Sequence, residues 1–201
     1  MKIGPRYKKA RYLGVPVFPK TQTQKYAMRL QRKSKTMARR GAKSEYGKQM
    51  MEKQKARFSY GIGGKQFTNY VKKALKTSGD NGKNLLSLLE SRLDNTMVRA
   101  GYAPSHSAAR QMVSHGHIAV NGVNVRVPSH QVRVGDTLTI REGSKSKVIF
   151  SKLDEQLKSV KHPNWMSIDE KTKTIKIIGK PVNESTDLLF DVGAVLEFYT
   201  R

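Results

Sequence analysis

Residues 105–127 read SHSAARQMVSHGHIAVNGVNVRV. Ser105 can cap a short helix, because its hydroxyl can accept a hydrogen bond from a backbone N–H of the first turn, and Gly116 ends that helix. Asn121 and Gly122 then give the strongest short hairpin signal, since a type I′ turn needs positive φ at both central residues. The stretch therefore predicts a short helix followed by a β-hairpin.

Three further helices are predicted before this stretch. Residues 65–77 place apolar side chains at i, i+3, i+4, i+7 and i+8, which forms one stripe along a helix. Residues 84–100 are predicted as one helix with a dense leucine face, and Gly101 is suited to end it. A lysine-rich helix is predicted from the N-cap Ser44 to Phe58. Helices combined with a small sheet indicate the α+β class.

The C-terminal part predicts short strands. Trp165 and Ile168, followed by residues 174–178, indicate a small β appendage. Residues 132–140 predict another hairpin-like element, and residues 194–200 predict a last strand or extended segment.

The charge of the chain is strongly positive and unevenly distributed. It has 39 Lys and Arg residues, 15 Asp and Glu residues and a formal net charge of +24. Residues 1–57 hold 18 basic and 2 acidic residues, whereas residues 151–201 hold eight of each. Such an excess causes self-repulsion in a compact state, so we expect a polyanionic partner. Residues 1–19 contain several Gly and Pro and few large aliphatic residues, which predicts a basic extension rather than a domain.

Several functional classes are disfavoured. The sequence has no cysteine, which excludes disulfides, thiol catalysis and thiolate zinc sites. It has no apolar run of membrane-spanning length, no P-loop and no nucleophile elbow. We therefore expect no enzymatic activity, no cofactor, no bound metal and no membrane association. For His115 and His117, contact with phosphate or base edges and an ordinary surface role both remain open.

The cationic residues suit a nucleic acid. If two helices pack side by side, Arg92, Arg99 and Arg110 could form one cationic shelf. A flexible basic arm with interspersed tyrosines suits irregular RNA, because cations follow phosphates and aromatic faces stack on unpaired bases. A helix-turn-helix, a zinc site or a heptad element for duplex DNA is not evident. A solubilising tail and a membrane-surface role are the weaker alternatives. The tyrosines of the arm are Tyr7, Tyr12 and Tyr26.

A set of motifs runs from residue 46 towards the C-terminal end. They are Tyr46-Gly47, EKQK at 52–55, Arg57, Tyr60-Gly61, Gln66-Phe67, Tyr70, NLL at 84–86, LESRLDN at 89–95, AARQMVSHGHIAVNG at 108–122, PNW at 163–165 and EFYTR at 197–201. Taken together they resemble the family of small-subunit ribosomal protein four over about residues 44–201.

The resemblance implies a fold in two parts. Residues 44–90 would form a helical domain completed by about residues 182–201. Residues 91–150 would form the family's inserted RNA-binding module of helices and a small sheet. The residues outside these parts, read by themselves, predict the β appendage at 151–181 and a basic extension at 1–43 that RNA orders.

The resemblance also implies a role in the cytoplasmic ribosome. Proteins of this family bind small-subunit ribosomal RNA at a multi-helix junction of the 5′ domain and help to nucleate assembly of the subunit body. They lie beside small-subunit protein five near the mRNA entry path and influence decoding accuracy. The alternative is another protein with the same module, such as a pseudouridine synthase or a tRNA-ligase appendage. Only about 50 residues follow the module, and they show no recognisable catalytic Asp.

The candidate RNA-binding residues come from the motif match and from the cationic segments. The motif match gives Tyr46, Lys53, Lys55, Arg57, Tyr60, Arg110, Gln111, His115 and His117, and for Tyr60 packing is the alternative. Ser105 and His106, in the segment at residues 103–106, are further candidates. The cationic segments give Arg6, Lys8, Lys9, Arg11, Arg39, Arg40, Lys43, Lys48, Lys65, Arg92 and Arg99.

The chain also departs from the family pattern. It lacks the four-cysteine N-terminal zinc site of many members. His106 stands where the family usually has Arg, which puts one phosphate contact in doubt at neutral pH. Ala100 replaces a larger apolar residue.

Overall fold

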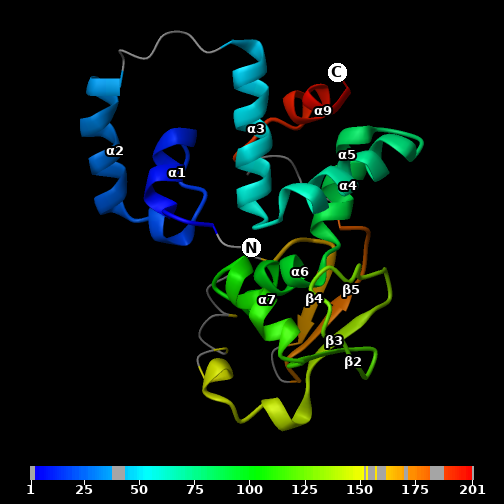
Figure 1. Cartoon of the computed structure of the whole chain (residues 1–201). Helices are drawn as coiled ribbons and strands as arrows, with labels where there is room; N and C mark the ends of the chain where they lie inside the picture. Colours follow the sequence, from blue (N-terminus) through cyan, green and yellow to red (C-terminus); the bar gives the residue numbers. More distant parts are fainter. Residues whose placement is uncertain are drawn as a thin grey trace. The chain divides into compact units, whose positions relative to one another are not determined.

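The chain forms two compact units, Met1–Gly82 with Ser185–Arg201, and Lys83–Glu184 (Figure 1). The computed structural model describes residues 3–37, 44–151, 153, 157, 162–169, 172–181 and 188–200. Helices and one antiparallel sheet confirm the predicted α+β class. The finer division of the chain into four segments stays a prediction. In the described ranges no helix is both long and apolar enough to cross a membrane.

The first unit contains helices α3 (Glu45–Ser59), α4 (Gly64–Lys76) and α9 (Val192–Thr200), and α9 lies beside α3 (Figure 1). Ser44 caps α3 as predicted, with its Oγ accepting a hydrogen bond from the Gly47 N–H at 3.3 Å. The prediction of a last strand at residues 194–200 is wrong, because this segment is helical.

The helical conformation of α9 follows from what its side chains contact. Val195 is buried, and Phe198 and Tyr199 lie three and four positions further, on the same side of a helix. The Phe198 ring packs against Tyr46 with centroids 5.5 Å apart, and the Tyr199 ring packs against Phe67 at 6.2 Å. These contacts need a period near four residues, which a strand with its period of two cannot supply.

The N-terminal part of the first unit has a small core of its own. Helix α1 (Arg6–Leu13), the 3-10 turn η1 (Pro19–Thr21) and helix α2 (Gln24–Met37) lie along the chain before α3. These residues lie in the basic extension predicted over residues 1–43, and its ordering by RNA stays a prediction. The buried members of the cluster are Ala10, Leu13, Val17, Phe18, Tyr26 and Phe58.

The second unit begins with a broken helix. Residues predicted as one helix form α5 (Asn81–Glu90) and α6 (Leu93–Arg99), so that prediction is wrong at Ser91 and Arg92. The carbonyl of Ser91 accepts a hydrogen bond from Val132 N–H at 2.8 Å, and Arg92 forms an isolated bridge with Gln131. These backbone hydrogen bonds to a distant segment replace hydrogen bonds within a helix, and they outweigh the helix propensity of the segment.

The predicted helix and hairpin at residues 105–127 are confirmed. Helix α7 (His106–Ser114) begins where Ser105 Oγ accepts from the Ala108 N–H at 3.3 Å. Strands β1 (Ile118–Val120) and β2 (Val123–Asn124) pair antiparallel, and the turn between them has φ of 51° at Asn121 and 79° at Gly122. The expected positive φ at both residues is thus present.

One five-stranded antiparallel sheet connects the module with the later strands. Strands β3 (Thr137–Ile140), β4 (Met166–Asp169) and β5 (Thr174–Ile177) complete the order β2-β1-β3-β5-β4. Strand β3 pairs with β1 and β5, so the hairpin predicted within residues 132–140 is wrong. Helices α6 and α7 pack on this sheet (Figure 1), with a core that includes Met97, Val113, Ile118, Leu138 and Ile175.

Candidate nucleic-acid interface

A buried carboxylate binds two arginines of the second unit. Asp94 Oδ1 and Oδ2 accept hydrogen bonds from Arg92 Nε at 2.9 Å and from Arg92 Nη2 at 2.7 Å. Asp94 Oδ2 also accepts from Arg110 Nε at 3.1 Å and from Arg110 Nη2 at 2.7 Å. The side chains of Asp94 and Arg92 are 1% and 2% exposed, whereas 27% of Arg110 is exposed. Arg92 is therefore withdrawn from the surface, and Arg110 is held partly in solvent.

A second buried carboxylate holds Arg99. Glu90 accepts hydrogen bonds from Arg99 Nε at 3.0 Å and Arg99 Nη2 at 2.8 Å, and from Asn95 Nδ2 at 2.6 Å. The Arg99 side chain remains 35% exposed. Because the amide nitrogen of Asn95 donates to Glu90, its Oδ1 is left to accept from His106 Nε2, 2.9 Å away. The two networks fix α5, α6 and α7 to one another.

His106 is neutral near pH 7 in this setting. Burial lowers the pKa of its imidazole from 6.5 to about 4, because a charged ring loses its solvation there. The ring donates to Asn95 rather than acting as a cation. Phosphate binding through a charged His106 is thus not favoured, and its role in the structure is to hold Asn95 and, through it, Glu90.

The remaining candidate RNA-binding residues of the second unit differ in their exposure. Gln111 and His115 are exposed, while Ser105 uses its hydroxyl to cap α7. His117 is buried, with Nδ1 2.9 Å from Ser144 Oγ and its ring edge-on to Phe150 at 6.2 Å. Burial, and then the nearby Lys147, lower the pKa of His117. His117 therefore packs inside the module.

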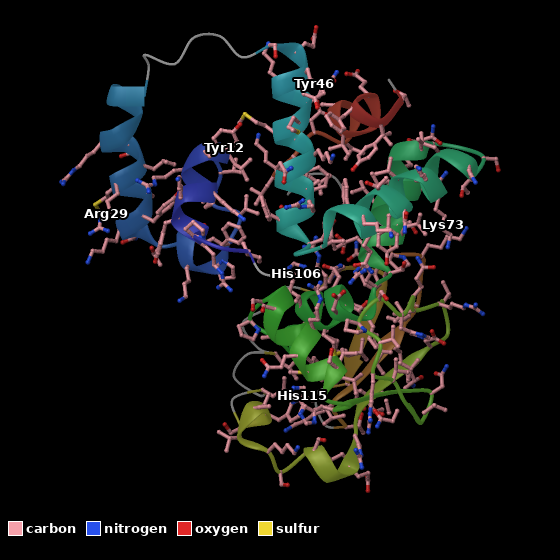
Figure 2. All side chains as sticks on the ribbon, viewed as in Figure 1. Tyr12, Arg29, Tyr46, Lys73, His106 and His115 are labelled. Atoms are coloured by element: carbon pink, nitrogen blue, oxygen red, sulfur yellow. The ribbon has the colours of Figure 1, made fainter. Side chains whose placement is uncertain are left out.

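Helix α3 presents a second cationic surface, on which several side chains already have partners. Lys53 Nζ lies 4.2 Å from the centre of the Phe198 ring, and Lys55 Nζ lies 2.6 Å from a carboxylate oxygen of Glu52. Lys48 is exposed, as are Tyr46 (Figure 2) and, on α4, Lys65.

Arg57 and Tyr60, at the end of α3, are more enclosed. The Arg57 guanidinium lies 4.7 Å from the centre of the Phe58 ring, and burial lowers its pKa. Its Nε is buried and has no hydrogen-bond partner among the described residues. Tyr60 is buried with its ring edge-on to Phe190 at 6.3 Å, which matches the packing alternative.

Four candidates of the N-terminal arm lie on α1. Lys8 is exposed, while Arg6, Lys9 and Arg11 are half-buried. Lys9 Nζ lies 4.9 Å from the centre of the Phe58 ring and donates to the carbonyl of Ile3. The other three candidates of this arm lie outside the described residues: Arg39, Arg40 and Lys43.

The sequence analysis missed the two residues that position the arginines, Glu90 and Asp94. A signal was available, since LESRLDN places two acids within a leucine-rich face, and buried acids are rare unless they are paired. In the described ranges, no group of three or more His, Asp or Glu side chains could hold a metal ion.

Two family models match successive parts of the sequence. Residues 1–90 match the family described as "Ribosomal protein S4/S9 N-terminal domain", and residues 91–138 match the "S4 domain". The networks of Asp94 and Glu90 and helix α7 all lie within these matched ranges.

Individual relatives agree with this match. The small ribosomal subunit protein uS4 of Syntrophomonas wolfei is 44% identical over 163 residues, which cover 81% of this chain and 78% of that protein. The protein of the same name from Chlorobium limicola is 37% identical over 194 residues, 96% of each chain. In Thermosynechococcus vestitus the identity is 41% over 162 residues, 81% of this chain and 80% of the relative. The chain therefore belongs to the family of small ribosomal subunit protein uS4.

Proposed function

We propose that this protein binds small-subunit ribosomal RNA at a multi-helix junction of the 5′ domain and nucleates assembly of the subunit body. Its family consists of structural proteins of the small ribosomal subunit and not of enzymes. The alternative of an enzyme that carries the same module is therefore set aside.

The observation that carries this proposal is the fixation of Arg99 and Arg110 by buried carboxylates. A guanidinium whose fork is already oriented loses less side-chain entropy when it binds a phosphate. Asp94 also serves two arginines with one negative charge, so its network keeps a net positive charge for an anionic partner. The rigid α6–α7 pair can thus present two cations to the RNA backbone, while the exposed Gln111 offers a group for base edges.

A neighbouring protein and mRNA are further proposed partners. The last 51 residues hold as many acidic as basic residues, which suits contact with protein better than wrapping by RNA. We propose that small-subunit protein five contacts this neutral part of the chain and that the cationic surface of α3 lies close to the mRNA entry path. Such a position would account for an influence on decoding accuracy.

The test is a binding experiment with RNA alone. The full chain is mixed with a transcript of the small-subunit 5′ domain in the absence of other ribosomal proteins, and crosslinked RNA from cells is sequenced in parallel. Tight binding to the transcript, together with ribosomal RNA in the crosslinks, is the expected result. A need for other ribosomal proteins would contradict early binding, and a predominance of tRNA or mRNA would contradict the proposed target.

A further inference from the structure

A cavity of about 340 Å³ lies between α1 and α2 in the first unit. Its size is within the range of about 300–1,000 Å³ that is usual for small-molecule and cofactor sites. Two aromatic rings and three cations contribute to its lining: Tyr7, Tyr26, Arg11, Lys25 and Arg29. Figure 2 marks Arg29 on α2 and, on α1, Tyr12, which does not line the cavity.

The two aromatic side chains of the cavity have different exposures. Tyr26 is 6% exposed and belongs to the N-terminal core, whereas Tyr7 is 51% exposed. Their ring centroids are 5.8 Å apart with an interplanar angle of 37°. The Tyr26 ring thus contacts Tyr7 on the side of the core, and the exposed half of the Tyr7 surface can stack on another flat group. The Tyr26 hydroxyl is buried without a hydrogen-bond partner in the described part of the chain.

The charged side chains of the cavity are all positive. The first acidic residue of the sequence is Glu45, so no carboxylate precedes it along the chain. Arg11, Lys25 and Arg29 form no ion pair within the described residues. Three cations around one cavity repel one another, and an anion bound between them would relieve that repulsion.

We propose that this cavity binds one unpaired nucleotide of the RNA, with its base stacked on Tyr7 and its phosphate among Arg11, Lys25 and Arg29. This inference rests on the proposed function and specifies a site within it. A nucleotide in a strand suits the cavity better than a free one, because the same two helices carry further exposed cations. Lys8 on α1 and Arg32 on α2 can meet the neighbouring phosphates of the same strand.

The first test uses photocrosslinking of the unaltered full chain. The 5′-domain transcript is prepared with 5-iodouridine, irradiated in the complex and digested, and the modified peptide is identified by mass spectrometry. A crosslink on Tyr7 is expected. A complex that forms tightly but crosslinks at Tyr12, or nowhere on α1 and α2, overturns the proposal.

The second test compares two tyrosines of one helix that are almost equally exposed, Tyr7 at 51% and Tyr12 at 53%. Tyr7→Ala should weaken binding of the transcript about 5- to 150-fold, the usual effect of losing one base–aromatic stack. Tyr12→Ala should change it less than about twofold, and Tyr7→Phe should retain the affinity because the ring remains. If the unaltered chain binds RNA tightly but Tyr7→Ala and Tyr12→Ala have equal effects, the nucleotide site in the cavity is overturned and the proposed function stands. If the unaltered chain does not bind the transcript, the proposed function is overturned.

Free uridine monophosphate separates the two sources of a nucleotide. It should compete with the transcript only at concentrations far above those of the RNA, because it lacks the flanking phosphates. Tight binding of the free nucleotide that Tyr7→Ala abolishes, with RNA affinity unchanged, would show a mononucleotide site and overturn the RNA assignment.

Discussion

Asp94 holds Arg110 through two hydrogen bonds to one carboxylate oxygen, at 3.1 Å from Nε and 2.7 Å from Nη2. The same carboxylate binds the buried Arg92, so one acid fixes an interior cation and a partly exposed one. Removing the acid would therefore affect stability through Arg92 and RNA binding through Arg110.

Asp94→Ala should lower the free energy of unfolding by about 3–5 kcal/mol, because it leaves the buried guanidinium of Arg92 without its counter-ion. Urea denaturation at pH 7 measures this change. The matched control is Glu142→Gln, which breaks the exposed pair with Lys145 at 3.0 Å and should leave the unfolding midpoint unchanged. Equal midpoints for Asp94→Ala and the unaltered chain would contradict the importance of the buried network.

Arg110→Ala should weaken binding of the 5′-domain transcript by about 1–3 kcal/mol, as expected for the loss of a charge-assisted phosphate contact. Its effect on stability should be smaller than that of Asp94→Ala, since Asp94 keeps Arg92 as a partner. Filter binding at fixed salt and urea denaturation measure the two effects separately. Arg110→Lys keeps the charge without the planar fork, so its affinity for the transcript should lie between those of the unaltered chain and Arg110→Ala. An unchanged affinity for Arg110→Ala would remove this residue from the RNA site.

The stability of the second unit should decrease as the pH falls from about 6.5 to about 4. The folded-state pKa of His106 is lowered to about 4 from 6.5, so the unfolded chain takes up this proton at a higher pH than the folded chain does. The stabilising effect is complete above pH 6.5 and is lost as the pH falls towards 4, and the gap corresponds to about 3 kcal/mol.

The variant His106→Gln isolates the histidine from the carboxylates that titrate in the same range. The difference in unfolding free energy between the unaltered chain and this variant, measured in urea at several pH values, should decrease between pH 6.5 and pH 4. A constant difference over this range would mean that His106 does not titrate as the half-buried neutral group described above.

Local signals in the sequence predicted the module well. The positive φ values at Asn121 and Gly122 and the cap at Ser105 depend on neighbouring residues alone, and both are present. The break at Ser91 and Arg92 has no local signal, because backbone groups some 40 residues away cause it. Interactions between distant segments therefore limited the prediction of helix boundaries.

Interactions between distant segments also limited the prediction of which charged residues are exposed. Sequence spacing linked Arg92 with Arg99, and Arg110 joined them on the condition that two helices pack side by side. The structure brings Arg92 and Arg110 to one carboxylate. Spacing could not show that Arg92 is buried, since burial depends on the packing of α6 against segments outside it. The small number of aliphatic residues likewise concealed the N-terminal core, in which the rings of Phe18 and Phe58 pack against each other.

Phe18→Ala tests whether the N-terminal core holds without RNA. The Phe18 ring is buried and lies 5.7 Å from the ring of Phe58, and truncation of such a side chain is expected to cost about 3–5 kcal/mol. Amide hydrogen exchange of the free protein should show protection on α1 that the variant loses. Equally rapid exchange in both proteins would contradict a stable core and favour the expectation that RNA orders this segment.

Salt dependence measures how much of the RNA affinity comes from phosphate contacts. With about 10 phosphates neutralised, the slope of log K against log salt concentration should lie near −7 to −9, because each contact releases bound counter-ions. Replacing the exposed Lys8 by Ala should make the slope less steep by about 0.7–0.9. Lys176→Ala removes an exposed lysine from the neutral C-terminal part and should leave the slope unchanged. A slope flatter than about −2 for the unaltered chain would contradict an electrostatic RNA interface, and equal slopes for the two variants would place Lys8 outside it.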